Sequence, residues 1–223
     1  VTCLTALTEK GFEVFPTDDT IFQHELDSLR DVEFAGIKIG LLPTVSVAEK
    51  ALDFIKQRPG VPVVLDPVLV CKETHDVAVS ELCQELIRFF PHVSVITPNL
   101  PEAEEIVGFS IHDPEDMQRA GRLIIKEFGP QSVVIKGGHL EGGAKDFLFT
   151  KEEQFVWESP RIQTCHTHGT GCTFAAVITA ELAKGKTLYQ AVDKAKAFIT
   201  KAIQDAPQLG HGSGPVNHTS FKD

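Results

Sequence analysis

The sequence predicts an α/β fold in which a mostly parallel, doubly wound sheet is covered by helices on both faces. Segments with the composition of strands alternate with segments whose apolar residues recur at helical spacing, a pattern that favours parallel strands joined by right-handed crossovers. Residues 61–65 form a continuous apolar run, as expected of a strand buried on both faces. Polar clusters follow several predicted strands, at the sheet edge where such folds bind ligands.

The first part of the chain is predicted to contain two strands and two helices. Residues 1–7 are apolar and β-branched enough for a strand, or for the end of a helix that leads into one. Residues 9–19 are mixed and include Pro16. The elements expected next are a helix over 20–29 with N-cap candidates at 17–19, a short strand over 36–40, and a helix that Pro43-Thr44 opens and Lys56 ends.

Strands and helices alternate through the rest of the chain, up to a Gly-rich tail at 210–223 that is expected to be a loop. Residues 146–150 and 154–157 are predicted to form a hairpin. No repeat, low-complexity tract or linker is visible, so residues 1–223 are predicted to be one domain. The other predicted strands are 61–65, 93–96 and 132–135, and the other predicted helices are 77–90, 101–107, 115–128, 171–183 and 188–206.

The net charge and the cysteine content disfavour several classes of protein. The 223 residues carry a net charge of -10 without a Lys/Arg-rich run, which disfavours nucleic acid as the main partner, because binding a phosphate backbone needs a basic face. The five cysteines are odd in number and scattered, so we expect a reducing cytoplasm rather than a disulfide framework. No signal peptide or long apolar run is visible, so neither secretion nor a membrane span is expected.

The most informative stretch is Thr167-His168-Gly169-Thr170-Gly171-Cys172-Thr173-Phe174, which leads into a strong helix former. The start of a helix has free N–H groups and a positive dipole end, and two glycines there let the backbone curl around a phosphate. The stretch is neither a Walker A loop nor GxGxxG, and an ordinary loop before a core helix is the alternative. Cys172 lies where a thiolate is favoured, and its alternative role is that of a small buried apolar residue.

Oxygen ligands and one cation follow other strands. Asp66, Asn99 and Glu102 suit Mg²⁺, which keeps most of its waters and takes one or two carboxylates plus substrate phosphates. The alternatives are a strand-ending turn at Asp66 and a capping box formed by Asn99 and Glu102. Lys136, beside two glycines, suits phosphate oxygens, and otherwise is a solvated lysine at a turn. A zinc site is a less favoured interpretation, because the spacing is not that of a finger; its ligands would be Cys165, His166, His168 and Cys172.

Together these features predict phosphoryl transfer, which needs an anion cradle, cations that take up charge and an acceptor hydroxyl held in line. The chain resembles the bacterial hydroxymethylpyrimidine/phosphomethylpyrimidine kinases of the ribokinase-like superfamily, from residue 1 to Gly214-Pro215-Val216-Asn217-His218 in the tail. The motifs that carry the resemblance are Leu65-Asp66-Pro67-Val68, Ile96-Thr97-Pro98-Asn99-Leu100-Pro101-Glu102-Ala103, Val134-Ile135-Lys136-Gly137-Gly138-His139 and His166-Thr167-His168-Gly169-Thr170-Gly171-Cys172-Thr173.

The resemblance implies an ATP- and Mg²⁺-dependent kinase of thiamine biosynthesis. It phosphorylates 4-amino-5-hydroxymethyl-2-methylpyrimidine and then the monophosphate, in a ribokinase-like, three-layer αβα fold. Cys172 takes the place of the catalytic Asp of sugar kinases, and the acceptor is expected near residues 1–7 and 38–42. The roles implied are an anion hole at Gly169, Thr170, Gly171 and Cys172, ATP binding by Lys136, Asp66, Asn99 and Thr97, a metal motif at Asn99 and Glu102, and substrate contacts at Lys38, Gly40 and Leu41.

Three departures from the family pattern concern the acceptor more than the kinase chemistry. The family opens with a strand and a Gly-rich segment that nothing before Val1 matches, so about 30–40 residues, including the N-terminal strand, are expected to be missing. Leu41 stands in the place of a Met, and the stretch after Leu7 is shorter than in the family, so the family's substrate-side Gln has no clear counterpart at Glu9 or Lys10. Pyridoxal kinase activity and a homologue that binds pyrimidine or nucleotide without turnover are the alternatives. Dimers are common in the family, so the resemblance allows a homodimer.

Overall fold

The computed structural model describes residues 1–8, 11–69, 76–138, 144–209 and 213–220. Glu9, Lys10 and His139, which the sequence analysis named, lie outside these ranges, and so do one of the five cysteines, Cys71, and parts of the predicted tail loop. None of the helices in the described ranges is long and apolar enough to cross a membrane.

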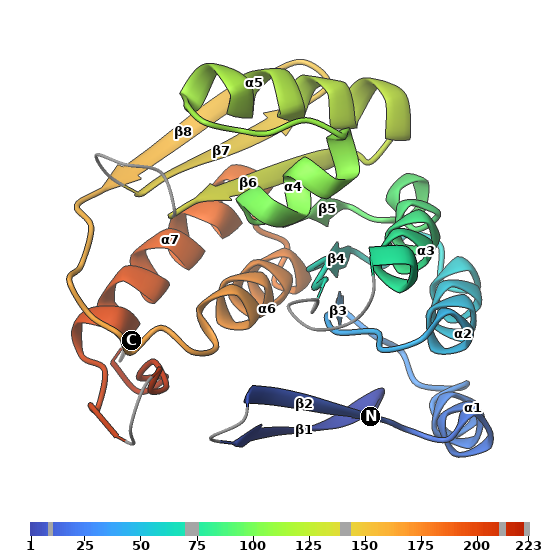
Figure 1. Ribbon diagram of the computed structural model, residues 1–223. Coiled ribbons are helices and arrows are strands. Elements are labelled where there is room, and N and C mark those ends of the chain that lie inside the picture. The colour runs from blue at the N-terminus through green and yellow to red at the C-terminus, as the bar shows by residue number, and fades with distance from the viewer. Residues whose placement is uncertain (9–10, 70–75, 139–143, 210–212, 221–223) are drawn as a thin grey trace.

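The main sheet is mixed and mostly parallel, as predicted (Figure 1). In the described residues its strand order follows the chain, and the first four strands pair in parallel while the last two are antiparallel. The predicted hairpin is confirmed as the last two strands. The strands are β3 (Ile37–Ile39), β4 (Val63–Leu65), β5 (Val95–Ile96), β6 (Ser132–Gly137), β7 (Ala144–Thr150) and β8 (Gln154–Ser159).

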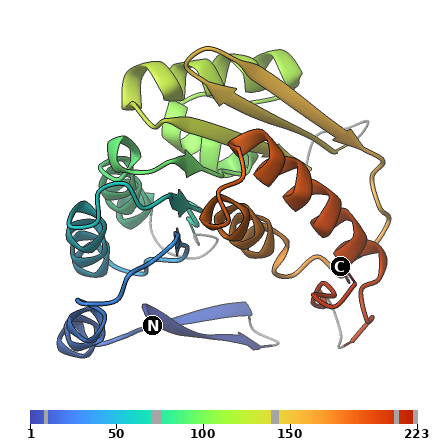
Figure 2. The same cartoon turned by 180° about the vertical axis from the view of Figure 1, so that it is seen from behind.

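Helices cover both faces of this sheet, which confirms the three-layer α/β class (Figures 1 and 2). One apolar cluster packs helices α2 to α5 on one face, and a second packs α6 and α7 on the other. Strand residues alternate between the two clusters: Leu65 belongs to the first and Val64 to the second, because successive side chains of a strand point to opposite faces. The helices are α1 (Asp19–Ser28), α2 (Val45–Lys56), α3 (Asp76–Ile87), α4 (Leu100–Val107), α5 (Pro114–Leu123), α6 (Thr170–Ala183) and α7 (Leu188–Gln204).

Several helix limits follow from local chemistry. Asp18 and Thr44 cap the N-termini of α1 and α2 through their side chains, as Asp and Thr commonly do. The predicted helix over 115–128 is α5 followed by a π-helical turn (Ile124–Phe128), and a short 3-10 helix (Phe90–His92) follows α3.

The N-terminal segment contains the strand that was predicted within residues 1–7, but also a second strand that was not predicted. β1 (Cys3–Thr8) and β2 (Gly11–Pro16) form a separate antiparallel hairpin, apart from the main sheet in both views (Figures 1 and 2). β2 was not expected, because its apolar residues do not alternate with polar ones as in a half-buried strand. Leu4 pairs with Phe15 across the hairpin, and these side chains are 69% and 54% exposed.

Candidate active site

Three neighbouring parallel strands bring Asp66, Thr97 and Lys136 together at their carboxyl ends. Asp66 follows β4, Thr97 follows β5, and Lys136 lies near the end of β6. The Lys136 ammonium donates a 2.9 Å hydrogen bond to Oδ1 of Asp66, and the Thr97 hydroxyl donates one of 3.0 Å to the same oxygen. The Asp66 side chain is only 2% exposed, so its charge is held by these two partners rather than by water.

Burial alone would lower the pKa of Lys136, but the negative charges of Asp66 and Glu102 more than offset it, so the pKa is raised. Lys136 is therefore a fixed, protonated cation at neutral pH. Its side chain is 17% exposed. The alternative of a solvated lysine at a turn does not fit this environment.

Asn99 and Glu102 form a capping box at the start of α4. The Asn99 side chain accepts from the N–H of Glu102 at 2.9 Å, and the Glu102 carboxylate accepts from the N–H of Asn99 at 2.7 Å. The capping interpretation is thus confirmed as geometry. A parallel bridge also joins Asn99 to Lys136, which sets the cap beside the Lys136–Asp66 pair.

Glu102 is 7% exposed, and burial raises its pKa to about 7. Lys136 and the backbone N–H groups of Asn99 and Leu69 oppose this rise, while the carboxylate of Asp66 adds to it. The charges of the two carboxylates thus act on each other, and carboxylates are ligands that Mg²⁺ favours. A divalent cation would keep Glu102 ionised at neutral pH, because ligand carboxylates bind in their charged form.

The start of α6 lies directly over the Lys136–Asp66 pair. Gly169 caps the helix with a φ of +86°, a left-handed conformation that glycine adopts without strain. A Cβ on Gly171 would lie 3.2 Å from the Lys136 ammonium and 3.8 Å from Oδ2 of Asp66. In the described part of the chain, the N–H groups of Gly171 and Cys172 have no backbone hydrogen-bond partner. Backbone donors, a cation and a glycine gap thus converge as an anion cradle requires.

Cys172 is an exposed free thiol in the first turn of α6, so the alternative role as a buried packing residue does not hold. Next to it, Thr170 donates its hydroxyl to the carbonyl of Thr167 at 2.6 Å and tightens the turn. Among the described residues, no group of three or more His, Cys, Asp or Glu side chains could hold a metal ion, and the zinc interpretation of Cys165, His166, His168 and Cys172 gains no support.

The predicted acceptor residues lie together, near the Asp66 end of the sheet. Lys38, Gly40 and Leu41 line a hollow of about 380 Å³ beside β3, whose outer edge has no strand partner among the described residues. The hydroxyl of Thr2 donates to the carbonyl of Leu41 at 2.8 Å, so the start of β1 borders this hollow. The Asp66 N–H donates to the carbonyl of Ile39 at 2.8 Å, so Asp66 is the backbone partner of a residue that lines the hollow.

Sequence reasoning missed two groups that support the site. On one side, Asp146 accepts from the N–H of Gly137 at 3.0 Å and from the Lys196 ammonium at 2.6 Å. On the other, a hydrogen bond of 2.9 Å joins His218 to Thr173. The only early signal for the second group was the tail motif that contains His218.

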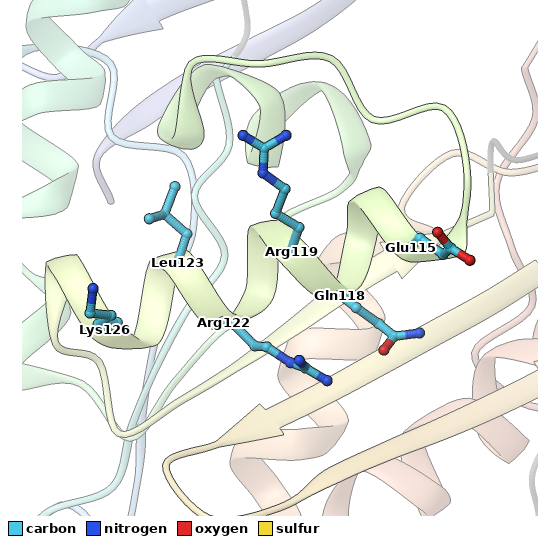
Figure 3. Close-up of a pocket in the computed structure, with 6 residues that line it drawn as sticks. All are labelled: Glu115, Gln118, Arg119, Arg122, Leu123 and Lys126. Atoms are coloured by element: carbon cyan, nitrogen blue, oxygen red, sulfur yellow. The ribbon is translucent and has the colours of Figure 1, made fainter.

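A larger, shallow hollow of about 460 Å³ lies along the outer face of α5 (Figure 3). Its lining comes from α5 and the turn after it, and includes Arg119, Arg122 and Lys126 but none of the predicted site residues. Figure 3 shows Arg119 and Arg122 pointing away from each other. These cations therefore do not converge on a common ligand.

Comparisons with known proteins show which proteins this chain is similar to. A family model described as phosphomethylpyrimidine kinase matches residues 1–217. The hydroxymethylpyrimidine/phosphomethylpyrimidine kinase of Staphylococcus aureus is 46% identical over 201 residues, which are 88% of this chain and 73% of that protein. An ADP complex of Bacillus subtilis pyridoxal kinase has 38% identity and a TM-score of 0.92, covering 99% of this chain and 85% of that chain. A phosphomethylpyrimidine kinase from Clostridium difficile has 33% identity and a TM-score of 0.75, covering 91% and 84%.

Proposed function

The chain belongs to the phosphomethylpyrimidine kinase family, and from this premise we propose the reaction and the roles of its residues. The chain is a ribokinase-like phosphotransferase that uses ATP to phosphorylate 4-amino-5-hydroxymethyl-2-methylpyrimidine and then the monophosphate, in thiamine diphosphate biosynthesis. The observation that carries the proposal is the position of Gly171, against both Lys136 and Asp66. That arrangement suits the phosphate end of a nucleotide.

In the proposed mechanism, the acceptor hydroxyl attacks the γ-phosphorus of ATP while the bond to the β–γ bridging oxygen breaks. The N–H groups of Gly171 and Cys172, in the turn that Gly169 and Thr170 shape, take up the charge that develops on the phosphoryl oxygens. Lys136 adds a positive charge, and Asp66 and Thr97 hold that lysine in place. Cys172 acts as the base that accepts the hydroxyl proton, or orients the hydroxyl by its position.

We propose that Glu102 and Asn99 would hold Mg²⁺, next to the negative charge of Asp66, which acts on Glu102. When bound, the ion neutralises phosphate charge. The capping role of Asn99 and Glu102 is compatible with this, because the box fixes the two side chains beside Lys136. Both functions then use the same conformation.

For the acceptor, we propose the hollow beside β3. Leu41 supplies an apolar wall for a flat ring, and the backbone at Gly40 with the ammonium of Lys38 supplies polar partners. A Cβ on Gly40 would lie only 2.5 Å from the Lys38 ammonium, so glycine leaves Lys38 room to fold over this position.

Pyridoxal kinase activity is the second candidate, and a specific observation favours it. The TM-score is 0.92 with the Bacillus subtilis pyridoxal kinase, against 0.75 with the Clostridium difficile phosphomethylpyrimidine kinase. The Staphylococcus aureus relative at 46% identity favours the pyrimidine. A stiff Leu41 in place of a methionine narrows what the pocket accepts.

The deciding experiment measures kcat/KM at saturating MgATP for the hydroxymethylpyrimidine, its monophosphate and pyridoxal. We expect the kcat/KM of each pyrimidine to exceed that of pyridoxal by at least ~10-fold. A ring that does not match the pocket leaves polar atoms unpaired, and each unpaired atom costs about 1–3 kcal/mol. Equal or better use of pyridoxal would promote the second candidate. Binding of all three without turnover would instead favour a non-catalytic homologue.

We further propose that residues 1–223 act as one domain and that two copies form a homodimer. The exposed Leu4–Phe15 pair of the hairpin supports a dimer, because an isolated two-stranded hairpin is marginally stable in water. The thiols of Cys3, Cys83, Cys165 and Cys172 are free, which suits a reducing cytoplasm.

A further inference from the structure

The tail segment Gly214-Pro215-Val216-Asn217-His218 has no part in the mechanism above, yet it is hydrogen-bonded to the loop before α6. The N–H of His168 donates to the carbonyl of Gly214 at 3.0 Å, and the N–H of Val216 donates to the carbonyl of His168 at 3.2 Å. These two bonds form a parallel bridge between His168 and Pro215. They hold the residue directly before Gly169, where the anion cradle begins.

The same segment makes a second contact at the other end of the Gly169–Cys172 turn, through His218. Nε2 of His218 is 2.9 Å from the hydroxyl of Thr173, a residue that is 8% exposed and directly follows Cys172. Thr173 also donates its backbone N–H to the carbonyl of Gly169 at 2.9 Å. The four residues from Gly169 to Cys172 are therefore bracketed by two contacts from one tail segment.

The segment itself is anchored to rigid structure. Val216 is 3% exposed and packs in the apolar cluster of α6 and α7. The N–H of Asn217 donates to the carbonyl of Ala202 at 2.9 Å, and its side-chain amide donates to the carbonyl of Asp205 at 3.1 Å. The tail thus connects the end of α7 to the start of α6.

Close packing leaves no room for a side chain at Gly214, the first residue of the segment. A Cβ on Gly214 would lie 2.2 Å from Nδ1 of His166 and 2.7 Å from the carbonyl oxygen of Leu209, distances that a real Cβ cannot adopt. Any other residue at 214 would push the tail away from the His168 loop.

We propose that residues 214–218 are a strap that fixes the Gly169–Cys172 turn in its anion-binding conformation, with His218 as a positioning residue for phosphoryl transfer. This rests on the proposed function. The physical reason is preorganisation: N–H donors stabilise developing charge fully only when they are already oriented, and a misplacement of about 1 Å can cost ~10²-fold in rate. His218 touches the turn through Thr173 and need not contact the substrate.

The test compares His218→Ala with His218→Gln, which keeps a polar group at this position, and with Thr219→Ala as a matched control. Thr219 hydrogen-bonds only to Asn217 in the described structure and does not touch the turn. We expect His218→Ala to lower kcat ~10-fold or more, with little change in the KM of the acceptor and in melting temperature. His218→Gln should restore part of kcat, and Thr219→Ala should match the parent protein. An unchanged kcat in His218→Ala would overturn the positioning role.

A second measurement does not depend on turnover. Amide hydrogen exchange of residues 168–173 should be faster in His218→Ala and in Gly214→Ala than in the parent protein, while exchange in β6 stays the same. Unchanged protection in both variants would overturn the strap even if the parent protein phosphorylates none of the three acceptors. If the parent protein phosphorylates none of the three acceptors but the two variants still exchange faster than the parent, the strap is supported and the proposed function is rejected.

Discussion

The ammonium of Lys136 lies 2.9 Å from Oδ1 of Asp66, although the two residues are 70 positions apart in the chain. Their side chains are 17% and 2% exposed. The pair lies under the first turn of α6, where a Cβ on Gly171 would come within 3.2 Å of the ammonium. This contact joins the sheet edge to the helix that carries Cys172.

Lys136→Met should lower both activity and stability. Loss of the cation leaves the buried carboxylate of Asp66 without its charged partner, which costs about 3 kcal/mol or more in the free energy of unfolding. It should also lower kcat roughly 10²-fold, the scale for one electrostatic contact to developing charge. Denaturant unfolding and steady-state kinetics measure the two effects. Adding Asp66→Asn should recover stability but not kcat, and recovery of both would contradict a role in ATP binding.

Gly171→Ala should separate stability from activity. The change replaces glycine by a better helix former within α6, so melting temperature should stay equal or rise. The new methyl group enters the space between Lys136 and the turn, so the KM for ATP should rise about 10-fold or more, the effect of losing one or two good phosphate contacts. An unchanged KM for ATP would show that phosphate binds elsewhere. Ala176→Gly in the same helix is the control, with lower stability and normal KM expected.

Cys172→Ala should keep the fold and lower kcat by roughly 10²-fold or more, the scale for a positioned acid–base group. The thiol is exposed, so little packing is lost. Cys165→Ala is a matched control, because Cys165 is also exposed and free. If both variants retain the parent kcat, Cys172 has no part in the chemistry.

Glu102→Gln should weaken the response to Mg²⁺ with little effect on the helix. Glutamine can still accept the N–H of Asn99, so the capping box survives. The Mg²⁺ concentration for half-maximal rate should rise, by about 10-fold for one lost charged ligand, while the melting temperature does not fall. A fall in melting temperature with the same Mg²⁺ dependence would mean that Glu102 only caps α4.

Glu102 also predicts a pH dependence of stability without Mg²⁺. Its pKa is about 7 in the folded protein, against an ordinary value of 4.5 for a glutamate, so the folded state binds more protons between these two pH values. The contribution of Glu102 to stability should therefore fall as pH rises from about 4.5 to 7, and be constant above. The unfolding free energy of Glu102→Gln minus that of the parent protein should therefore increase by about 1–3 kcal/mol from pH 5 to pH 8. Urea titrations at the two pH values test this, and a constant difference would contradict the raised pKa.

Much of the architecture could be predicted because its signals are local. The starts of α2 and α6 lie within one residue of the prediction, since a capping Thr44 and a left-handed Gly169 act on their own neighbours. The meeting of Asp66, Asn99 and Lys136 was predictable from a single rule, that parallel strands end at one sheet edge. β2 was missed because its pairing depends on β1 and not on its own pattern.

The sequence by itself determined the α/β class, the order of the strands and helices from α1 onward, and the polar residues that gather at the carboxyl edge of the sheet, because periodicity, caps and strand-end chemistry are properties of short segments. Only the tertiary structure decided that Gly171 faces Lys136, that Glu102 is buried enough for its pKa to reach about 7, and that His218 reaches Thr173 from 45 residues away. These relationships depend on how distant elements pack. The burial of a side chain and the contacts between distant residues arise only when the layers pack together, so the pattern of a short segment does not predict them.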